Sequence, residues 1–445
     1  MPEFANQNRS MAVSPWLDPP ATGCQLLEGN HKADVCVIGA GLTGLSTALA
    51  LASEGARVVV VESQYAGFGA SGRNAGHLTS QIGKDLPTLA RMYGTEKVRA
   101  LLLLAETAVD EVERLINHHD IQCDYKPVGN VLAAVDSGQF RTLDRAAETA
   151  RRFGVPFVPL DGRAMRARGL PSGFLHGGLE PHGGVLDPGR YVLGLRDAAR
   201  EAGVVIYESS PVVAIDDAKP AIVRTAAGEV HAETVVVGVN GYAYDLPIPG
   251  RARRLVLPIY VQLLRTDPLN PAQRARIDWK GEEGVYTAHE LLESWRMAAD
   301  GSIVGGSKII RYGYGGGRLR DRDGAVAQEL DAVFRRRFPA LADVDVASHW
   351  GGRIAMTLDF LPAVGRAGRA GNILYSTGYA GHGLALASYA GTMIADLLAG
   401  REGPGAALWG RRSFALPPEP LRWMAFQALS RMFAAFDRRI DRRLT

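Results

Sequence analysis

Residues 34–62 read DVCVIGAGLTGLSTALALASEGARVVVVE, a glycine-rich turn set between two apolar runs. The first run, Val35–Ile38, enters the turn, and a segment rich in helix-forming residues follows it. The second run, Val58–Val61, ends on the acidic residue Glu62. This order predicts a strand–helix–strand unit that carries the GxGxxG dinucleotide fingerprint.

The three glycines of the fingerprint have separate physical roles. Gly39 permits the tight turn out of the strand, Gly41 lets the backbone approach a pyrophosphate, and Gly44 lets helix and strand pack closely. The helix N-terminus offers unpaired N–H groups to the phosphates, and Glu62 can accept hydrogen bonds from a ribose diol. The motif predicts a bound dinucleotide, NAD or FAD, against the alternative of a purely structural turn.

The composition is that of a globular protein without a nucleic-acid partner. The chain has 445 residues, 47% of them hydrophobic, and a formal net charge of only +3 at pH 7, so a nucleic-acid-binding surface is not expected. Cys24, Cys36 and Cys123 show neither metal-ligand spacing nor a disulfide pattern. Because no apolar run reaches about 18 residues and no secretory signal is visible, we expect a cytoplasmic protein without a metal site.

The nucleotide-binding elements are interrupted twice by other material. The insertions are rich in short strands, whereas the flanking segments alternate between strands and helices. The predicted fold is therefore α/β (α+β), with a discontinuous Rossmann-like cofactor domain and an inserted substrate domain built on a mixed or antiparallel sheet. The predicted segments are an N-terminal arm (1–30, with 1–10 interpreted as vector-derived), the cofactor domain (31–91, 181–245 and 346–400), the substrate domain (92–180 and 246–345) and a C-terminal helical tail (401–445).

A second glycine-rich segment follows the fingerprint. Residues 69–77 read GASGRNAGH, where small residues let the backbone crowd a ligand and polar side chains supply donors. Ser71 and Asn74 are such donors, Arg73 is expected to neutralise a phosphate, and His77 lies furthest along the ligand. The alternative is a glycine-rich surface turn, which the position directly after the fingerprint disfavours.

A third glycine-rich turn opens a helix near the C-terminal end. Residues 378–400 read GYAGHGLALASYAGTMIADLLAG, with no acid in the first turn of the helix. The free N–H groups at such a terminus can stabilise an anion. A reduced flavin carries negative charge at N1 and at the C2 oxygen, so this terminus suits a flavin ring, against the alternative of a Gly-capped structural turn.

Taken in order, the motifs GAGLTG, GASGRNAGH, LDPGR, VVVGVNGY, WGGRIAMTLDFLPAVG and GYAGHG resemble the D-amino-acid-oxidase-like superfamily of FAD-dependent amine and amino-acid oxidoreductases. The ASGRNAG form of the second motif is most similar to the γ-glutamylputrescine oxidoreductase branch. The resemblance implies an FAD domain joined to a mixed-sheet substrate domain, with the adenine held by the backbone of Val212. It assigns FAD contacts to Gly39, Gly41, Gly44, Glu62, Ser71, Arg73, Asn74, His77, Val212, Gly381, His382, Gly383 and Leu384.

Two departures from related patterns bear on the cofactor and the substrate. Some sarcosine-oxidase-like members attach the flavin through a Cys seven residues before the Asp of a Thr-Pro-Asp motif. In this chain the matching triplet is 357–359 (Thr-Leu-Asp), and the position seven earlier is Gly352, so non-covalent FAD is expected. A substrate-binding Lys of those members is replaced by Ala385, which disfavours a small N-methyl amino acid.

The resemblance implies oxidation of a C–N bond, with a polyamine-derived or secondary amine favoured as substrate. Hydride would pass from the α C–H to flavin N5, water would hydrolyse the imine, and O2 or a quinone would reoxidise the flavin. Alternatives are a D-amino-acid or cyclic imino-acid dehydrogenase that reduces a quinone, and a non-catalytic FAD-binding subunit. The catalytic candidates are His77, His382 and Arg353, and the substrate-contact candidates are Tyr260, Trp295, Arg311 and Tyr379.

The C-terminal segment 421–442 reads LRWMAFQALSRMFAAFDRRIDR and is amphipathic at helical spacing. Two interpretations are open. The helix packs on the protein's own surface or on a partner subunit, or it lies on a membrane surface and delivers electrons to a quinone. The second interpretation predicts an enzyme peripheral to the inner membrane.

Overall fold

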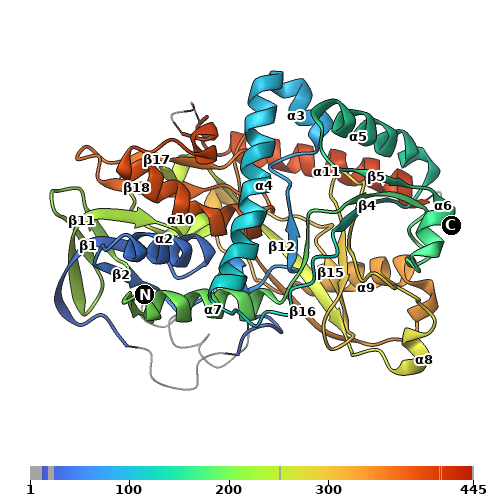
Figure 1. Ribbon diagram of the computed structural model, residues 1–445, viewed down its shortest axis with the longest axis horizontal. Coiled ribbons are helices and arrows are strands. Elements are labelled where there is room, and N and C mark those ends of the chain that lie inside the picture. The colour runs from blue at the N-terminus through green and yellow to red at the C-terminus, as the bar shows by residue number, and fades with distance from the viewer. Residues whose placement is uncertain (1–12, 19–24, 250–251, 410, 412, 443–445) are drawn as a thin grey trace.

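The structure is a computed structural model that describes residues 13–18, 25–249, 252–409, 411 and 413–442. The predicted vector-derived segment 1–10 lies outside the described residues. Two large sheets dominate the described part of the chain, one on each side of a long central helix, α4 (Thr95–His118) (Figure 1).

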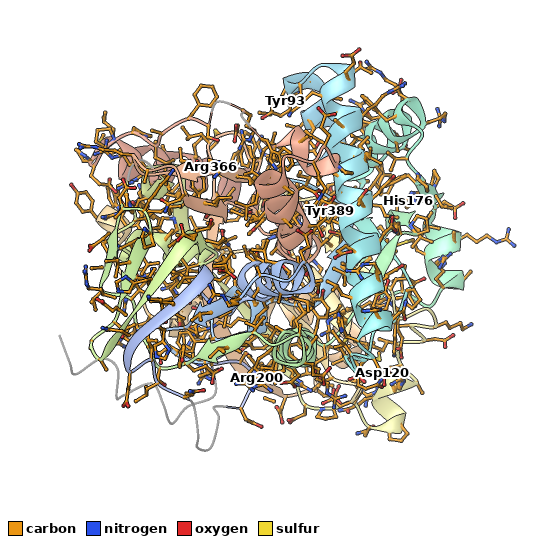
Figure 2. All side chains as sticks on the ribbon, turned by 60° about the vertical axis from the view of Figure 1, so that its left-hand side comes forward. Tyr93, Asp120, His176, Arg200, Arg366 and Tyr389 are labelled. Carbon is orange, nitrogen blue, oxygen red and sulfur yellow. The ribbon has the colours of Figure 1, made fainter. Side chains whose placement is uncertain are left out.

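The first sheet contains the fingerprint unit. Its apolar runs are fully buried strands of a mainly parallel sheet, as expected when helices cover the sheet, and α2 (Leu42–Ser53) and α10 (Gly383–Ala399) pack against each other beside it. Side chains fill the interface between α10 and α4, where Tyr389 lies (Figure 2). The strand order is β17 (Ala363–Ala367), β18 (Ile373–Thr377), β11 (Gly228–Val237), β1 (Gly29–Ile38), β2 (Val58–Val61) and β8 (Val205–Tyr207), with β10 (Ala221–Arg224) and β9 (Ala214–Asp216) joined to β11.

The second sheet is mixed, as predicted. Most neighbours are antiparallel, while β13 and β4 are parallel. One face packs on α9 (Gly324–Arg337) through an aromatic core. The strand order is β16 (Val346–Met356), β12 (Leu257–Thr266), β15 (Ile303–Gly306), β14 (Ser294–Met297), β13 (Gly284–Thr287), β4 (Asn130–Ala134), β6 (His176–Glu180) and β5 (Val158–Leu160).

The remaining helices connect or flank these sheets. A small sheet of β3 (His77–Thr79) and β7 (Gly183–Val185) lies at the junction, because β3 contacts α10 and α4 while β7 contacts β4. The other helices are α3 (Leu86–Met92), α5 (Phe140–Phe153), α6 (Gly162–Ala167), α7 (Pro188–Glu201), α8 (Pro271–Arg274) and α11 (Leu421–Asp441).

One predicted domain boundary is wrong. The range 346–400 was expected to belong wholly to the cofactor domain, but β16 pairs along its length with β12 in the second sheet. The first sheet resumes only at β17. The reason is that sheet membership is decided by the hydrogen-bonded partner, which lies about ninety residues away in the sequence and leaves no local signal.

Candidate functional site

The fingerprint turn has the close packing that its glycines predict. Gly39 adopts φ +102°, a conformation that favours glycine. A Cβ atom added at Gly44 would lie 1.8 Å from the carbonyl oxygen of Gly39, and one at Gly41 would lie 2.8 Å from Oγ of Ser71. Close packing within the turn therefore requires glycine at Gly41 and Gly44.

Polar groups surround the N-terminus of α2. The Ser71 hydroxyl accepts a hydrogen bond from the backbone N–H of Leu42 at 2.9 Å, and Glu62 accepts from the N–H of Ala40 at 2.8 Å. The first turn of α2 contains no acid. Burial raises the pKa of Glu62. A helix N-terminus without acidic residues, a hydroxyl and an acid suited to a ribose thus lie at one end of the first sheet.

Val212 lies on the chain that leaves β8 toward β9. In this segment the N–H of Ser210 donates to the backbone carbonyl of Glu62 at 2.8 Å. Val212 is half-buried and packs on the core beneath β1 and β2. Its position beside the acid fits the adenosine end of a dinucleotide.

Arg73 and Asn74 shape the loop rather than face open space. The guanidinium of Arg73 donates to Asp321 at 2.5 Å and to the carbonyls of Gly351 and Phe68 at 2.9 and 2.7 Å. These contacts join the loop to the second sheet. The positive charge of Arg73, which was predicted to neutralise a phosphate, is thus paired with Asp321. Asn74 accepts from the N–H of Gly76 at 2.8 Å and so fixes the turn before His77.

His77 is held in one tautomer by Asn130. The Asn130 amide nitrogen donates to the carbonyl of Leu78 at 2.8 Å, so its oxygen faces His77 Nδ1 at 3.0 Å and accepts from it. His77 Nε2 is buried and has no hydrogen-bond partner among the described residues. Burial lowers the pKa of His77 to about 4, so the ring is neutral near pH 7 and Nε2 carries a free lone pair.

The N-terminus of α10 has the features expected of an anion site. Gly381 adopts φ +92°, His382 is the residue before the helix, and neither a side-chain cap nor an acid occupies the first turn. His382 Nδ1 is buried without a partner among the described residues, and burial lowers its pKa to about 4. Gly383 and the buried Leu384 begin the helix. The terminal N–H groups are therefore available to a negatively charged group.

The residues along these motifs fit FAD. The fingerprint turn is built from glycines that leave no room for side chains, an acid and a hydroxyl border it, and an uncapped helix terminus lies at the other end of the motifs. Two neutral imidazoles with unpartnered nitrogens supply hydrogen-bonding groups that a buried polar ring could satisfy.

Trp295 and Tyr379, which were predicted to contact a substrate, both have polar partners inside the protein. Trp295 is fully buried in the core of the second sheet, and its indole N–H donates to Glu293 at 3.2 Å. The Tyr379 hydroxyl lies 2.8 Å from the hydroxyls of both Thr43 and Ser376, which joins α2 to β18. Burial raises the pKa of Tyr379 to about 12. Both side chains therefore make their hydrogen bonds within the protein's interior.

Arg353, Tyr260 and Arg311 form a cluster on β12 and its neighbours. Arg353 donates to the Tyr260 hydroxyl at 2.6 Å and to Asp245 at 2.8 Å, and Arg311 pairs with Asp323 at 2.9 Å. Both arginines therefore have acidic partners inside the protein. A substrate carboxylate at Arg353 would have to compete with Asp245.

A polar group beside His77 was not predicted from the sequence. Glu180 ends β6, directly opposite Asn130 of β4, and its carboxylate accepts from the Gln81 amide at 3.0 Å. Tyr286 of β13 contacts the same amide. Because these residues meet only through strand pairing across 50 or more positions, no local motif marks them.

The chain matches known proteins over most of its length. Residues 34–397 match the family described as FAD dependent oxidoreductase (DAO). The chain is 34% identical over 375 residues to gamma-glutamylputrescine oxidoreductase of Escherichia coli, a match covering 84% of this chain and 85% of that protein. It is 32% identical over 378 residues to the probable oxidoreductase OrdL of Haemophilus influenzae, covering 83% and 84% of the two chains.

The solved structures agree in fold. Glycine oxidase from Geobacillus kaustophilus superposes with a TM-score of 0.72 at 22% identity, covering 86% of this chain and 100% of that chain. The two-sheet architecture thus agrees with the fold that the sequence motifs predicted. By family match and by sequence identity, the chain is an FAD-using enzyme that belongs to the DAO family of FAD-dependent oxidoreductases.

Proposed function

We propose that this enzyme oxidises the C–N bond of an amine or amino acid, with a polyamine-derived or secondary amine favoured. The observation that carries the proposal is His77, a neutral ring whose buried Nε2 lacks a partner, at the junction where β3 contacts α10. The 34% identity to gamma-glutamylputrescine oxidoreductase supports an amine substrate.

In the proposed reaction, the N-terminus of α10 and His77 have separate roles. When bound, FAD would supply the hydride acceptor for the carbon next to nitrogen, and water would hydrolyse the released imine to a carbonyl product and an amine or ammonia. The N–H groups at the start of α10 would stabilise negative charge on the ring. His77 Nε2 accepts a hydrogen bond, and its pKa of about 4 makes it a positioning acceptor rather than a store for the amine's proton.

Other parts of the site support narrower proposals. Glu62, Ser71, Val212 and the fingerprint glycines hold the ADP half of FAD. Gly352 stands where related enzymes carry the attaching Cys, which supports non-covalent FAD. The runner-up activity is a D-amino-acid or cyclic imino-acid dehydrogenase, and the acceptor is either O2 or a quinone.

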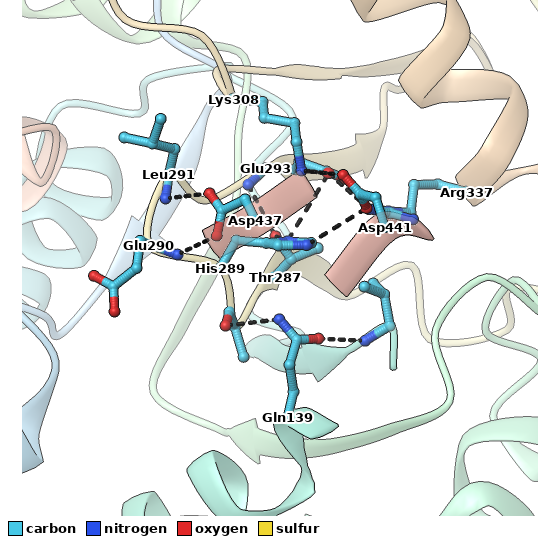
Figure 3. Close-up of polar contacts among 12 residues, drawn as sticks. Gln139, Thr287, His289, Glu290, Leu291, Glu293, Lys308, Arg337, Asp437 and Asp441 are labelled. Carbon is cyan, nitrogen blue, oxygen red and sulfur yellow. Dashed lines mark hydrogen bonds and ion pairs between the residues drawn. The ribbon is translucent and has the colours of Figure 1, made fainter. Parts of the chain in front are cut away.

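The C-terminal helix α11 is anchored to the second sheet by its inner face. Asp437 accepts from the backbone N–H groups of Glu290 and Leu291 at 3.0 and 2.9 Å, and Asp441 pairs with Lys308 and Arg337 at 2.9 and 2.6 Å (Figure 3). These anchors keep the helix on the protein.

Asp441 also belongs to a cluster that could be mistaken for a metal site. Its ligand atom and those of His289 and Glu293 lie within 4.8 Å of one another. Burial opposes ionisation of Glu293, but the charges of Arg337 and Lys308 outweigh it and lower its pKa to about 2. With two cations already paired to its carboxylates, the cluster is an ion-pair network.

The outer face of α11 supports a proposal of peripheral membrane contact. Five large apolar residues at helical spacing are 44–59% exposed on this helix, and both of its acids point inward while exposed arginines flank the stripe. An apolar stripe with basic flanks suits the surface of an anionic bilayer. The stripe is Leu421, Met424, Leu429, Met432 and Phe436, and the arginines are Arg431, Arg438 and Arg439. Among the described helices, none is both long enough and apolar enough to cross a membrane.

The proposed reaction is tested by identifying its products. The purified enzyme is incubated with a panel of diamines, N-acyl diamines, secondary amines and D-amino acids. The carbonyl products are trapped and identified by mass spectrometry. We expect aldehyde from a diamine or its acyl derivative. Turnover confined to D-amino acids would instead establish the runner-up.

A further inference from the structure

Glu180 lies on a shared face of the second sheet with two residues near His77. Directly opposed residues of antiparallel strands point to the same side, and Glu180 is opposed to Asn130. Asn130 is also level with Gly284 on the parallel neighbour β13, so Tyr286, two residues further, points to that side as well. Since Asn130 binds His77, this face is turned toward the histidine.

The carboxylate of Glu180 is bound only by neutral donors. The Gln81 amide donates to both of its oxygens at 3.0 Å. Burial, together with the negative charge of Glu180, raises the pKa of the Tyr286 phenol well above its usual value, so this group keeps its proton and can donate to the carboxylate.

No ion pair among the described residues includes Glu180, in contrast to the buried Glu293, which has both Lys308 and Arg337 within 3 Å. Burial accordingly raises the pKa of Glu180. Glu180 is half-buried, and a carboxylate that is partly removed from water without a cation is costly, so a ligand that brings a positive charge would compensate it.

The segment 77–84 locates the Glu180 carboxylate relative to both histidines. Gln81 comes four residues after His77, and Lys84, three residues further, is close enough to His382 for its charge to contribute to the lowered pKa of that ring. The segment 77–84 therefore passes from one imidazole to the neighbourhood of the other, and Glu180 is bonded to its middle.

We propose that Glu180, with Gln81 and Tyr286, forms a subsite for a cationic nitrogen of the substrate, remote from the C–N bond that is oxidised. The inference rests on the proposed amine oxidation and deepens it by naming the substrate class as amines that carry a second, positively charged nitrogen. The remote nitrogen is assigned because a carboxylate stabilises an ammonium ion, whereas the nitrogen beside the reacting C–H must be neutral to release hydride. The neutral His77 suits the nitrogen beside the reacting C–H.

The first experiment compares a diamine with the monoamine of the same chain length. We expect the Glu180→Gln variant to lower kcat/KM for 1,4-diaminobutane by about 10- to 100-fold, chiefly through KM, because a charged hydrogen bond is lost. Activity on the monoamine should change less than about 3-fold. Glu180→Asp should retain part of the preference, and the exposed Glu148→Gln on α5 serves as the matched loss of one charge.

The second experiment measures binding without turnover. A diamine with two methyl groups on each carbon next to nitrogen has no C–H bond to oxidise there, and its affinity for the flavin-loaded enzyme is measured by calorimetry beside that of the matching monoamine. We expect the diamine to bind more tightly to the native enzyme and to Glu148→Gln, and to lose that advantage in Glu180→Gln. Flavin content and melting temperature confirm that each variant is folded.

The two experiments separate the subsite from the reaction. If no amine is oxidised while the diamine binds in a Glu180-dependent way, the reaction proposal fails and the subsite stands. If diamine and monoamine lose activity and affinity equally in Glu180→Gln, Glu180 is a structural acid and the subsite is overturned. The same conclusion follows if neither ligand responds to the substitution.

Discussion

The amide of Asn130 fixes the tautomer of His77 by donating to Leu78 with its nitrogen while its oxygen lies 3.0 Å from His77 Nδ1. Asn130 of the second sheet thereby determines which ring nitrogen of His77, on β3, carries the proton. The consequence is that His77 presents an unprotonated Nε2.

Asn130→Asp should make His77 basic. A carboxylate beside Nδ1–H favours the charged ring, so the pKa of His77 should rise from about 4 toward or above its ordinary value. As pH falls below about 6, kcat/KM should then decrease because Nε2 becomes protonated. A pH–rate profile compares the two enzymes, with Asn130→Ser as the uncharged control. An unshifted profile in a folded Asn130→Asp enzyme would show that His77 is not the acceptor.

His77 and His382, each with one buried ring nitrogen, should make the protein less stable in mild acid. Their folded pKa of about 4 is below that of the unfolded chain, so the unfolded state binds more protons between pH 6.5 and 4 and the stability falls as pH decreases through that window. Each histidine contributes up to about 1.4 kcal/mol per pH unit. Denaturant unfolding of the native enzyme, His77→Gln and His382→Gln at several pH values should show shallower slopes for the variants. Equal slopes would mean that neither ring is buried as described.

Gly44→Ala should abolish FAD binding. The added methyl group would lie 1.8 Å from the Gly39 carbonyl oxygen, and relieving that clash must move α2 away from the turn. We expect a loss of about 1–3 kcal/mol of unfolding free energy or more and a protein purified without flavin. Gly94→Ala is the control, because a Cβ there meets nothing within 4 Å. Normal flavin content in Gly44→Ala would contradict the assignment of this turn.

How much of this arrangement could be predicted depends on the range of the determining contacts. The fingerprint unit and the 378–400 turn were predicted because glycine placement and apolar runs act locally. The membership of β16 in the second sheet, the burial of Trp295 and the Asn130–His77 contact depend on strand pairing between distant segments. The Arg73 contact with Asp321 is of the same kind, since 248 positions separate the two residues.

The outer face of α11 should govern binding to anionic vesicles. Leu429→Ser combined with Met432→Ser removes apolar surface that is 50% and 44% exposed, while the anchors Asp437 and Asp441 are untouched. We expect the native enzyme to sediment with vesicles rich in phosphatidylglycerol and the double variant to remain in the supernatant. Leu103→Ser on α4, where the side chain is 55% exposed, is the control. Equal sedimentation of native and double-variant enzyme would exclude α11 as the membrane contact.

Anaerobic reduction of the bound flavin tests the central claim most directly. The purified enzyme is mixed without oxygen with diamines, N-acyl diamines, secondary amines and D-amino acids, and the visible absorption of the flavin is followed. We predict rapid bleaching by an amine that carries a second cationic nitrogen, and slower bleaching by that amine in His77→Gln. A flavin-loaded enzyme that no amine or amino acid bleaches would contradict the proposed function.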